Sequence, residues 1–242
     1  MTFSTHAMIV AQLPFIVKFF CFTVFPRTCS INLCLEYSRL WIYCQILAIN
    51  IGMTYFTHLP DLDVENYTNY FLHTFMPKNN FDEKNKSLLY IQYFRKEFYN
   101  DPNIMLLDCT LQKKYNFPPI EYFSIFKHDR QQTIHHDGLR IPRYASLNLP
   151  LQGFESTKMI FYKTLVNTPL NISDSNYYLP ENVEPVIELE GNNEWVLVDS
   201  SVPHNITNVD YNNPRITLCI RFISNPTYDF LAKNITDNSI KI

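Results

Sequence analysis

The sequence has no excess of positive charge, no closely paired cysteines and no internal repeat or low-complexity tract. Its 20 Lys and Arg residues are outnumbered by 23 Asp and Glu residues, giving a formal net charge of -3 and a pI near 6.1. A chain with this balance has no general attraction to a polyanion, so its net charge does not indicate nucleic acid as a partner. A local basic patch stays open as an alternative.

None of the 6 cysteines belongs to a C-x-x-C pair, the spacing that nucleates zinc sites and redox motifs. Four of them lie within the first 44 residues, and Cys109 and Cys219 stand alone in the remainder. Free thiols in a reducing compartment are therefore favoured over a disulfide framework. We expect a cytoplasmic protein, with membrane anchoring through the N-terminal apolar segment as the alternative.

Residues 1–52 form an apolar extension whose status the sequence leaves open. The run 7–25 has 19 residues, enough for a membrane span or a signal anchor, and membrane contact is expected only through this run. Pro14 and Lys18 both penalise a helix embedded in lipid. Met53 precedes a polar, well-patterned segment, so residues 1–52 also fit a spurious upstream region. Residues 53–242 are then expected to form a single domain.

Along this domain the spacing of apolar residues changes from one typical of helices to one typical of strands. Apolar residues recur at three and four positions over 61–76 and again over 87–99, which predicts helices within 61–100 that end near Pro77 and Pro102. From about 115 to 225 the pattern predicts short strands, at 133–137, 144–151, 158–163, 185–190, 195–199 and 215–222. We expect a mainly β sandwich or jelly roll with supporting N-terminal helices.

The run 215–222 shows the clearest alternation. One face would be apolar and would pack on the helices, and the other would carry Arg215, Thr217, Cys219 and Arg221 and line a pocket. A guanidinium that faces into a small barrel needs a charged partner, because burying it alone is costly. A ligand that bears a carboxylate would be such a partner.

His135, Asp137 and His204 are the candidate metal ligands. His135 and Asp137 are separated by one residue, so on a strand both would point to one face, and His136 would point away unless the strand is bulged. We expect the loop after His204 to bring Arg215 close to it across a hairpin. Two imidazoles and one carboxylate hold ferrous iron on one face and leave open positions for a bidentate co-substrate and dioxygen.

In this region the chain resembles the Fe(II)/2-oxoglutarate-dependent dioxygenase superfamily, on its prolyl-hydroxylase-like side and near its small phage and bacterial members. The matching segments are Ile134-His135-His136-Asp137-Gly138, then 145–151, 159–162, 197–208 and 215–222. The resemblance implies a double-stranded β-helix, a jelly roll of the cupin-like kind, in which His135, Asp137 and His204 bind Fe(II). It also implies that Arg215 binds the distal carboxylate of 2-oxoglutarate through a bidentate salt bridge.

The resemblance further implies that Thr217, Asn148 and Tyr162 contact the co-substrate, with Arg221 as the runner-up for its carboxylate. The implied reaction is hydroxylation of an unactivated C–H bond with release of succinate and CO₂. Its requirements are Fe(II), 2-oxoglutarate and O₂, with ascorbate as a candidate reductant. Because Asp137 supplies a carboxylate that halogenating relatives lack, hydroxylation is favoured over halogenation.

Two other classes of protein stay open: a non-catalytic jelly-roll binding or structural module, and a cupin-type metalloenzyme that uses no keto acid. Neither accounts for Arg215 together with the three ligands. The substrate is also open between a protein side chain, a small molecule, and a modified base or sugar. Arg143 and Arg140 are candidates for binding a substrate acid, and residues 165–193 would be a substrate-covering loop or a variable connection.

Overall fold

The computed structural model describes residues 54–239, apart from residue 60 and residues 80–89, 139–142, 166–169 and 173–174. The predictions for residues 1–52, including the membrane run 7–25, lie outside this part, as does Arg140. Among the described helices, none has the length and apolarity needed to cross a membrane.

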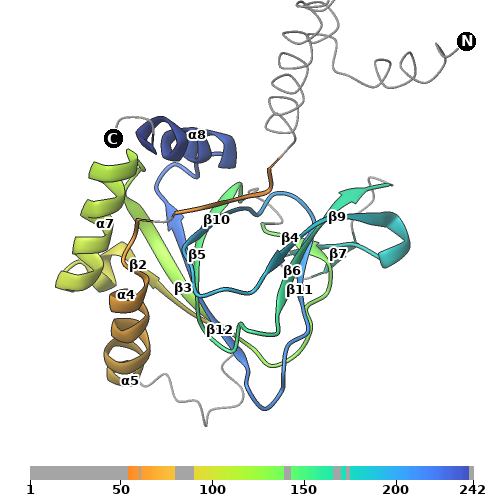
Figure 1. Cartoon of the computed structure of the whole chain (residues 1–242), viewed down its shortest axis with the longest axis horizontal. Coiled ribbons are helices and arrows are strands. Elements are labelled where there is room, and N and C mark those ends of the chain that lie inside the picture. The colour runs from red at the N-terminus through yellow and green to blue at the C-terminus, as the bar shows by residue number, and fades with distance from the viewer. Residues whose placement is uncertain are drawn as a thin grey trace, which may run out of the picture. The chain divides into compact units, whose positions relative to one another are not determined.

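Two six-stranded antiparallel sheets form the body of the protein (Figure 1). The major sheet has the order β1-β10-β5-β12-β3-β2, with β1 at Phe56–His58, β10 at Val196–Asp199, β5 at Ala145–Gln152, β12 at Arg215–Phe222, β3 at Ile120–His128 and β2 at Tyr90–Phe94. The minor sheet has the order β7-β8-β4-β11-β6-β9, with β7 at Leu170–Ile172, β8 at Ser175–Tyr177, β4 at His135–His136, β11 at His204–Thr207, β6 at Lys158–Thr164 and β9 at Val183–Glu190. This is a double-stranded β-helix, and the predicted mainly β jelly roll is confirmed.

The helices pack on the outer face of the major sheet (Figure 1). They are α4 at Val64–Tyr70, which continues through a π-helical turn at Phe71–Phe75 into α5 at Met76–Lys78, then α6 at Arg95–Phe98, α7 at Pro102–Tyr115 and α8 at Tyr228–Ser239. A short 3₁₀ turn at Pro180–Asn182 lies apart from them and leads into β9 of the minor sheet. Asp63 caps α4 by accepting from the backbone N–H of Asn66, so this helix begins three residues after the predicted start at 61.

The strict alternation of β12 divides the major sheet into two faces, as predicted. Its apolar side chains are buried in the helix-facing core, together with those of β5 and α7: Ile216, Leu218, Ile220 and Phe222, Leu147 and Leu149, Leu107 and Leu111. Removing each such side chain from water contributes about 1.5–3 kcal/mol. This core holds the polar face of β12 toward the minor sheet, where the candidate site lies.

The predicted helix over 87–99 is wrong. Residues 90–94 form β2, which pairs with β3, and among the described residues of this stretch only Arg95–Phe98 is helical. In β2, Ile91 and Tyr93 pack on the core, so successive side chains alternate between faces. Aromatic and β-branched residues suit a strand, and pairing with β3 outweighs the helical spacing of the apolar residues.

Helix α7 was missed because Pro102 was taken as a stop. In the structure Pro102 opens α7, and Asp101 caps it by accepting from the N–H groups of Asn103 and Ile104. A proline fits the first turn of a helix, since its missing N–H would have no partner inside the helix.

The predicted hairpin between His204 and Arg215 is also wrong. His204 begins β11 in the minor sheet and Arg215 begins β12 in the major sheet, so the connection crosses between sheets. Residues 165–193 are likewise more than a loop, because they contribute β7, β8 and β9 to the minor sheet. The other predicted strands coincide with β5, β6, β9, β10 and β12 to within one or two residues, and 133–137 contains the shorter β4.

Candidate metal and co-substrate site

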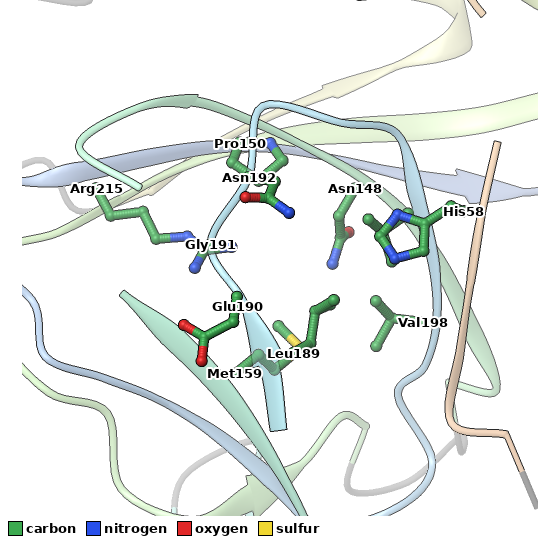
Figure 2. Close-up of a pocket in the computed structure, with 11 residues that line it drawn as sticks. His58, Asn148, Pro150, Met159, Leu189, Glu190, Gly191, Asn192, Val198 and Arg215 are labelled. Carbon is green, nitrogen blue, oxygen red and sulfur yellow. The ribbon is translucent and has the colours of Figure 1, made fainter. Parts of the chain in front are cut away.

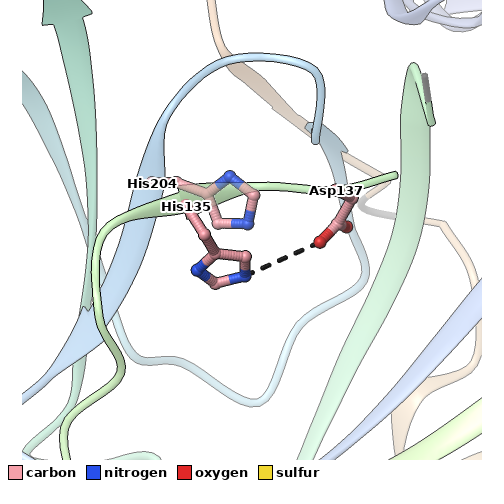
Figure 3. Close-up of side chains that lie close together, drawn as sticks. All are labelled: His135, Asp137 and His204. Atoms are coloured by element: carbon pink, nitrogen blue, oxygen red, sulfur yellow. Dashed lines mark ion pairs between the residues drawn. The ribbon is translucent and has the colours of Figure 1, made fainter. Parts of the chain in front are cut away.

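Two neighbouring strands of the minor sheet bring the three candidate ligands together. His135 of β4 and His204 of β11 are direct cross-strand partners, and Asp137 directly follows β4. One potential ligand atom from each residue lies within 4.8 Å of the others, and Nε2 of His135 is 3.6 Å from Oδ1 of Asp137 (Figure 3). The three side chains therefore converge on a space that one ion could occupy.

Both imidazoles are oriented by the backbone. Nδ1 of His135 lies 2.8 Å from the carbonyl oxygen of Thr133, and Nδ1 of His204 lies 2.9 Å from that of Val202. A carbonyl oxygen only accepts, so each Nδ1 carries the hydrogen and each Nε2 keeps its lone pair. This second hydrogen bond is the support that metal-binding histidines commonly have.

The electrostatics of the group suit a cation. Burial lowers the pKa of His204 to about 4, and the neighbouring His135 contributes in the same direction, so this imidazole is neutral at pH 7. Burial on its own would raise the pKa of Asp137, but Arg221 and the two histidines reverse that effect and bring the pKa below its usual value. The residues thus provide two imidazole nitrogens and one carboxylate, the donor set of a ferrous facial site.

Arg221 holds the ligand carboxylate from the opposite side. Its Nη2 donates to Oδ2 of Asp137, and its Nη1 donates to the carbonyl oxygen of Ala145 at 2.7 Å and to Oγ of Ser200 at 2.6 Å. Oδ2 is therefore occupied, and Oδ1 faces His135. Arg221 belongs to the support of this carboxylate, although the sequence suggested it only as a second choice for an anion.

His136 and Tyr162 lie on the other face of the minor sheet. The ring nitrogens of His136 contact the hydroxyl of Tyr178 at 2.8 Å and Nδ2 of Asn176 at 2.5 Å. Tyr162 packs in an outer cluster with Tyr178 and donates to Oδ1 of Asn205 at 3.1 Å. The structure therefore does not bring Tyr162 to the ligand group. Alternation along β6 puts Phe161 there instead, directly opposite His204.

Arg215 lies at the other end of the inward face of β12 and is 4% exposed. Its Nε donates to Oγ1 of Thr217 at 3.0 Å, and its Nη1 donates to Oγ1 of Thr157 at 2.7 Å. Among the described residues, no carboxylate lies within ion-pair distance of Arg215. Burial lowers its pKa to about 10, which still leaves the guanidinium charged at pH 7. A buried cation without a counter-ion is costly and is suited to an anionic ligand.

Two cavities extend through the barrel from the ligand group to Arg215. One of about 80 Å³ is lined by all three candidate ligands and by Thr217, and one of about 20 Å³ is lined by Arg215 (Figure 2). Asn148, Met159 and Val198 line both. The predicted residues Asn148 and Thr217 thus lie between the candidate metal ligands and the buried guanidinium.

Sequence reasoning missed three residues of this interior. Thr157 accepts a hydrogen bond from Arg215, Ser146 donates to Oδ1 of Asn148 at 2.6 Å, and His128 lines the cavity of about 80 Å³. Burial, with smaller contributions from Arg215 and His135, lowers the pKa of His128 to about 3, so its ring is neutral. The aromatic and β-branched residues in 120–128 were the available signal for a strand ending at His128, but this strand, β3, was not predicted.

A larger cleft of about 1050 Å³ opens in front of His135 and Asp137. Its walls come from β2, β3 and the segments around Asp129 and Tyr177, and they include Arg143 and Arg221. The candidate metal centre is therefore accessible from solvent on this side, whereas Arg215 is enclosed. Cys219, also on this wall, is a free thiol, as is Cys109.

Comparison with known proteins gives likenesses in structure alone. No family model matches the chain, and no curated protein matches it. Solved structures with similar folds include HygX from Streptomyces hygroscopicus with nickel and 2-oxoglutarate bound, at 12% identity and a TM-score of 0.40, covering 69% of this chain and 81% of that one. EctD from S. alaskensis with 2-oxoglutarate and 5-hydroxyectoine is 12% identical with a TM-score of 0.42, covering 72% and 74%.

A third similar structure, E. coli ycfD, is 13% identical with a TM-score of 0.34 and covers 55% of this chain. The present chain spans only 33% of the length of ycfD. All three TM-scores lie below 0.5, so these likenesses carry no weight in assigning a function to this chain.

Proposed function

We propose that the chain is an Fe(II)- and 2-oxoglutarate-dependent dioxygenase that hydroxylates an unactivated C–H bond. The proposal depends on two features that lie at opposite ends of the barrel interior. His135, Asp137 and His204 converge at one end, and Arg215, buried and without an acidic partner among the described residues, lies at the other. A cupin-type enzyme without a keto acid, or a non-catalytic jelly roll, has no use for that second feature.

The donor set fits ferrous iron. His135 and His204 would each offer Nε2, and Asp137 would offer Oδ1 while Arg221 holds Oδ2. When bound, the iron supplies activation of O₂, in which R–H, O₂ and 2-oxoglutarate are converted to R–OH, succinate and CO₂. The protein would contribute a fixed ligand geometry and a preorganised polar interior.

Arg215 would bind the distal carboxylate of 2-oxoglutarate, and Thr217 would add a hydroxyl contact beside it. The hydrogen bonds from Arg215 to Thr157 and Thr217 fix the plane of the guanidinium before any ligand arrives. A planar guanidinium that is already oriented suits bidentate binding of a carboxylate. Asn148, held by Ser146, would contact the middle of the co-substrate.

The test is succinate release from the purified full chain. We expect release that requires both Fe(II) and 2-oxoglutarate, that is abolished by His204→Ala, and that falls at least about a hundredfold with Arg215→Ala at low 2-oxoglutarate. Metal binding by the Arg215→Ala protein, measured by calorimetry with Ni(II), should match that of the wild type. Metal binding with no response to 2-oxoglutarate would favour the cupin-type alternative, and absence of both would favour a non-catalytic module.

A further inference from the structure

The cleft in front of the candidate metal ligands contains an arginine, Arg143, whose guanidinium lies over an aromatic ring. The guanidinium carbon of Arg143 lies 4.9 Å from the centre of the Tyr122 ring. Within the described part of the chain, no carboxylate lies within ion-pair distance of this arginine. Stacking on a ring orients a guanidinium and leaves its N–H edge available to an anion.

The other arginines of the cleft already have acidic partners. Arg221 is paired with Asp137, and Arg130, which is mostly exposed, is paired with Asp129 at 3.0 Å. Arg143 is half-buried, and burial followed by repulsion from Arg221 lowers its pKa, which the more distant charge of Glu121 only partly opposes. An incoming anion would favour the charged guanidinium and so offset both effects. Arg143 is therefore the arginine of this cleft best placed to bind a ligand.

Arg143 is fixed to the segment that carries the metal ligands. Its backbone N–H donates to the carbonyl oxygen of Asp137 at 3.3 Å, and its own carbonyl oxygen accepts from Oγ of Ser200 at 2.8 Å. Ser200 also contacts Arg221, so one hydrogen-bonded network joins the cleft arginine to the ligand carboxylate. An anion on Arg143 would thus be held at a fixed position relative to His135 and Asp137.

Aromatic rings form much of the remaining wall. Tyr90 and Phe126 contact each other with ring centres 4.8 Å apart, and Phe126 stacks on His128. On the other side, the Tyr177 ring lies 6.1 Å from that of His135. A space bounded by flat rings, with one charged group at its side, binds an apolar or planar body and orients it by a single polar anchor.

We propose that the substrate is a small organic anion, a carboxylate or phosphate ester attached to a ring or another flat apolar body, and that Arg143 binds its anionic group. This inference rests on the proposed function for the reaction itself, but anion binding in the cleft is testable without turnover. The proposal narrows the substrate to acids. The ring of the acid would lie between Tyr177 and Phe126, and its anionic group would bind Arg143.

The test measures binding of three matched probes to the metal-free full chain by ligand-observed NMR and calorimetry: phenylacetate, phenylacetamide and phenyl phosphate. We expect at least one anion to bind about tenfold more tightly than the neutral amide, because a charge-assisted pair replaces a neutral hydrogen bond. A preference for phenylacetate would assign a carboxylic acid, and a preference for phenyl phosphate would assign a phosphate ester.

Variants of the arginines test whether Arg143 is the residue that binds the anion. Arg143→Gln should remove the preference for the anion, Arg143→Lys should keep most of it, and the matched cleft variant Arg130→Gln should leave it within about twofold. Arg215→Ala should not affect probe binding, which separates this site from the proposed co-substrate site. Equal binding of acid and amide to the wild type, or a preference that survives Arg143→Gln but is lost with Arg215→Ala, would overturn the proposal. Circular dichroism melting of each variant checks that the fold is retained.

Discussion

Arg221 and Asp137 form an ion pair in which the arginine takes one carboxylate oxygen, Oδ2, and leaves the other, Oδ1, facing His135. The same guanidinium is fixed by Ala145 and Ser200, so the carboxylate has little freedom to rotate. In the proposed site, Asp137 would therefore bind the metal through one oxygen. The pairing would also lower the affinity for a cation somewhat, because the arginine neutralises part of the charge.

The first prediction concerns this pair. Arg221→Gln should weaken metal binding about 10- to 100-fold, the range found when the partner of a metal ligand is removed, because the carboxylate loses its orientation. Calorimetric titration with Ni(II) measures the change. Arg221→Lys should recover part of the affinity, and Arg215→Ala serves as the control that removes an arginine from the same strand. Unchanged metal affinity in Arg221→Gln would show that Asp137 is positioned without it.

Strand β12 was predictable because its alternation is strict and its apolar face meets a continuous core. The pair His135 and Asp137 was predictable for a similar reason, since residues two apart share a face of a strand. Contacts between segments that are distant in the sequence were not predictable. Thr157 and Arg215 are 58 residues apart, and Arg221 and Asp137 are 84 apart, so only the sheet topology brings each pair together.

For Tyr162 and for β2, the local sequence pattern led to wrong predictions. Tyr162 was selected for its residue type on a plausible strand, but parity along β6 turns it to the outer cluster. In β2, two of the apolar residues at helical spacing, Ile91 among them, also fit a strand with one face on the core, and β3 provides the pairing that decides.

The second prediction is that Arg215 reduces the stability of the ligand-free protein. Replacing it with methionine removes a buried charge that lacks an acidic partner, so Arg215→Met should leave the free energy of unfolding unchanged or raise it by about 1 kcal/mol. The same variant should lose measurable affinity for 2-oxoglutarate. Urea unfolding with and without 2-oxoglutarate tests both statements. A loss of more than about 2 kcal/mol would mean that the bonds to Thr157 and Thr217 are structural.

The third prediction follows from His128, whose folded-state pKa is lowered to about 3 from an ordinary value of 6.5. Between these values the unfolded chain binds the proton and the folded protein does not, so stability is complete above about pH 6.5 and falls as the pH drops toward 3. His128→Gln should reduce the stability lost between pH 7 and pH 5 by ~2 kcal/mol.

Urea midpoints at the two pH values measure this effect in the metal-free protein. The control is His73→Gln, which changes an exposed histidine on the π-helical turn and should leave the pH dependence as in the wild type. His204 contributes with the same sign, so some acid sensitivity should persist in His128→Gln. Parallel pH profiles for His128→Gln and the wild type would contradict the prediction.

The fourth prediction concerns Gly191, which lies beside the threonine that anchors Arg215. A Cβ at this position would lie 2.0 Å from the carbonyl oxygen of Phe154 and 2.6 Å from Oγ1 of Thr157, and the N–H of Gly191 donates to the carbonyl oxygen of Thr157 at 2.8 Å. Gly191→Ala should therefore displace Thr157 and destabilise the protein by about 1–3 kcal/mol.

Because Thr157 accepts from Nη1 of Arg215, this displacement should also tilt the guanidinium and weaken 2-oxoglutarate binding several-fold while leaving Ni(II) binding unchanged. Glu188→Ala, on the exposed side of β9 near Gly191, is the matched control and should change neither. Calorimetry with 2-oxoglutarate and with Ni(II) distinguishes an effect at Arg215 from an effect at the candidate metal ligands. If Gly191→Ala bound 2-oxoglutarate as the wild type does, Thr157 would not be what orients Arg215, and the guanidinium would owe its position to Thr217 alone.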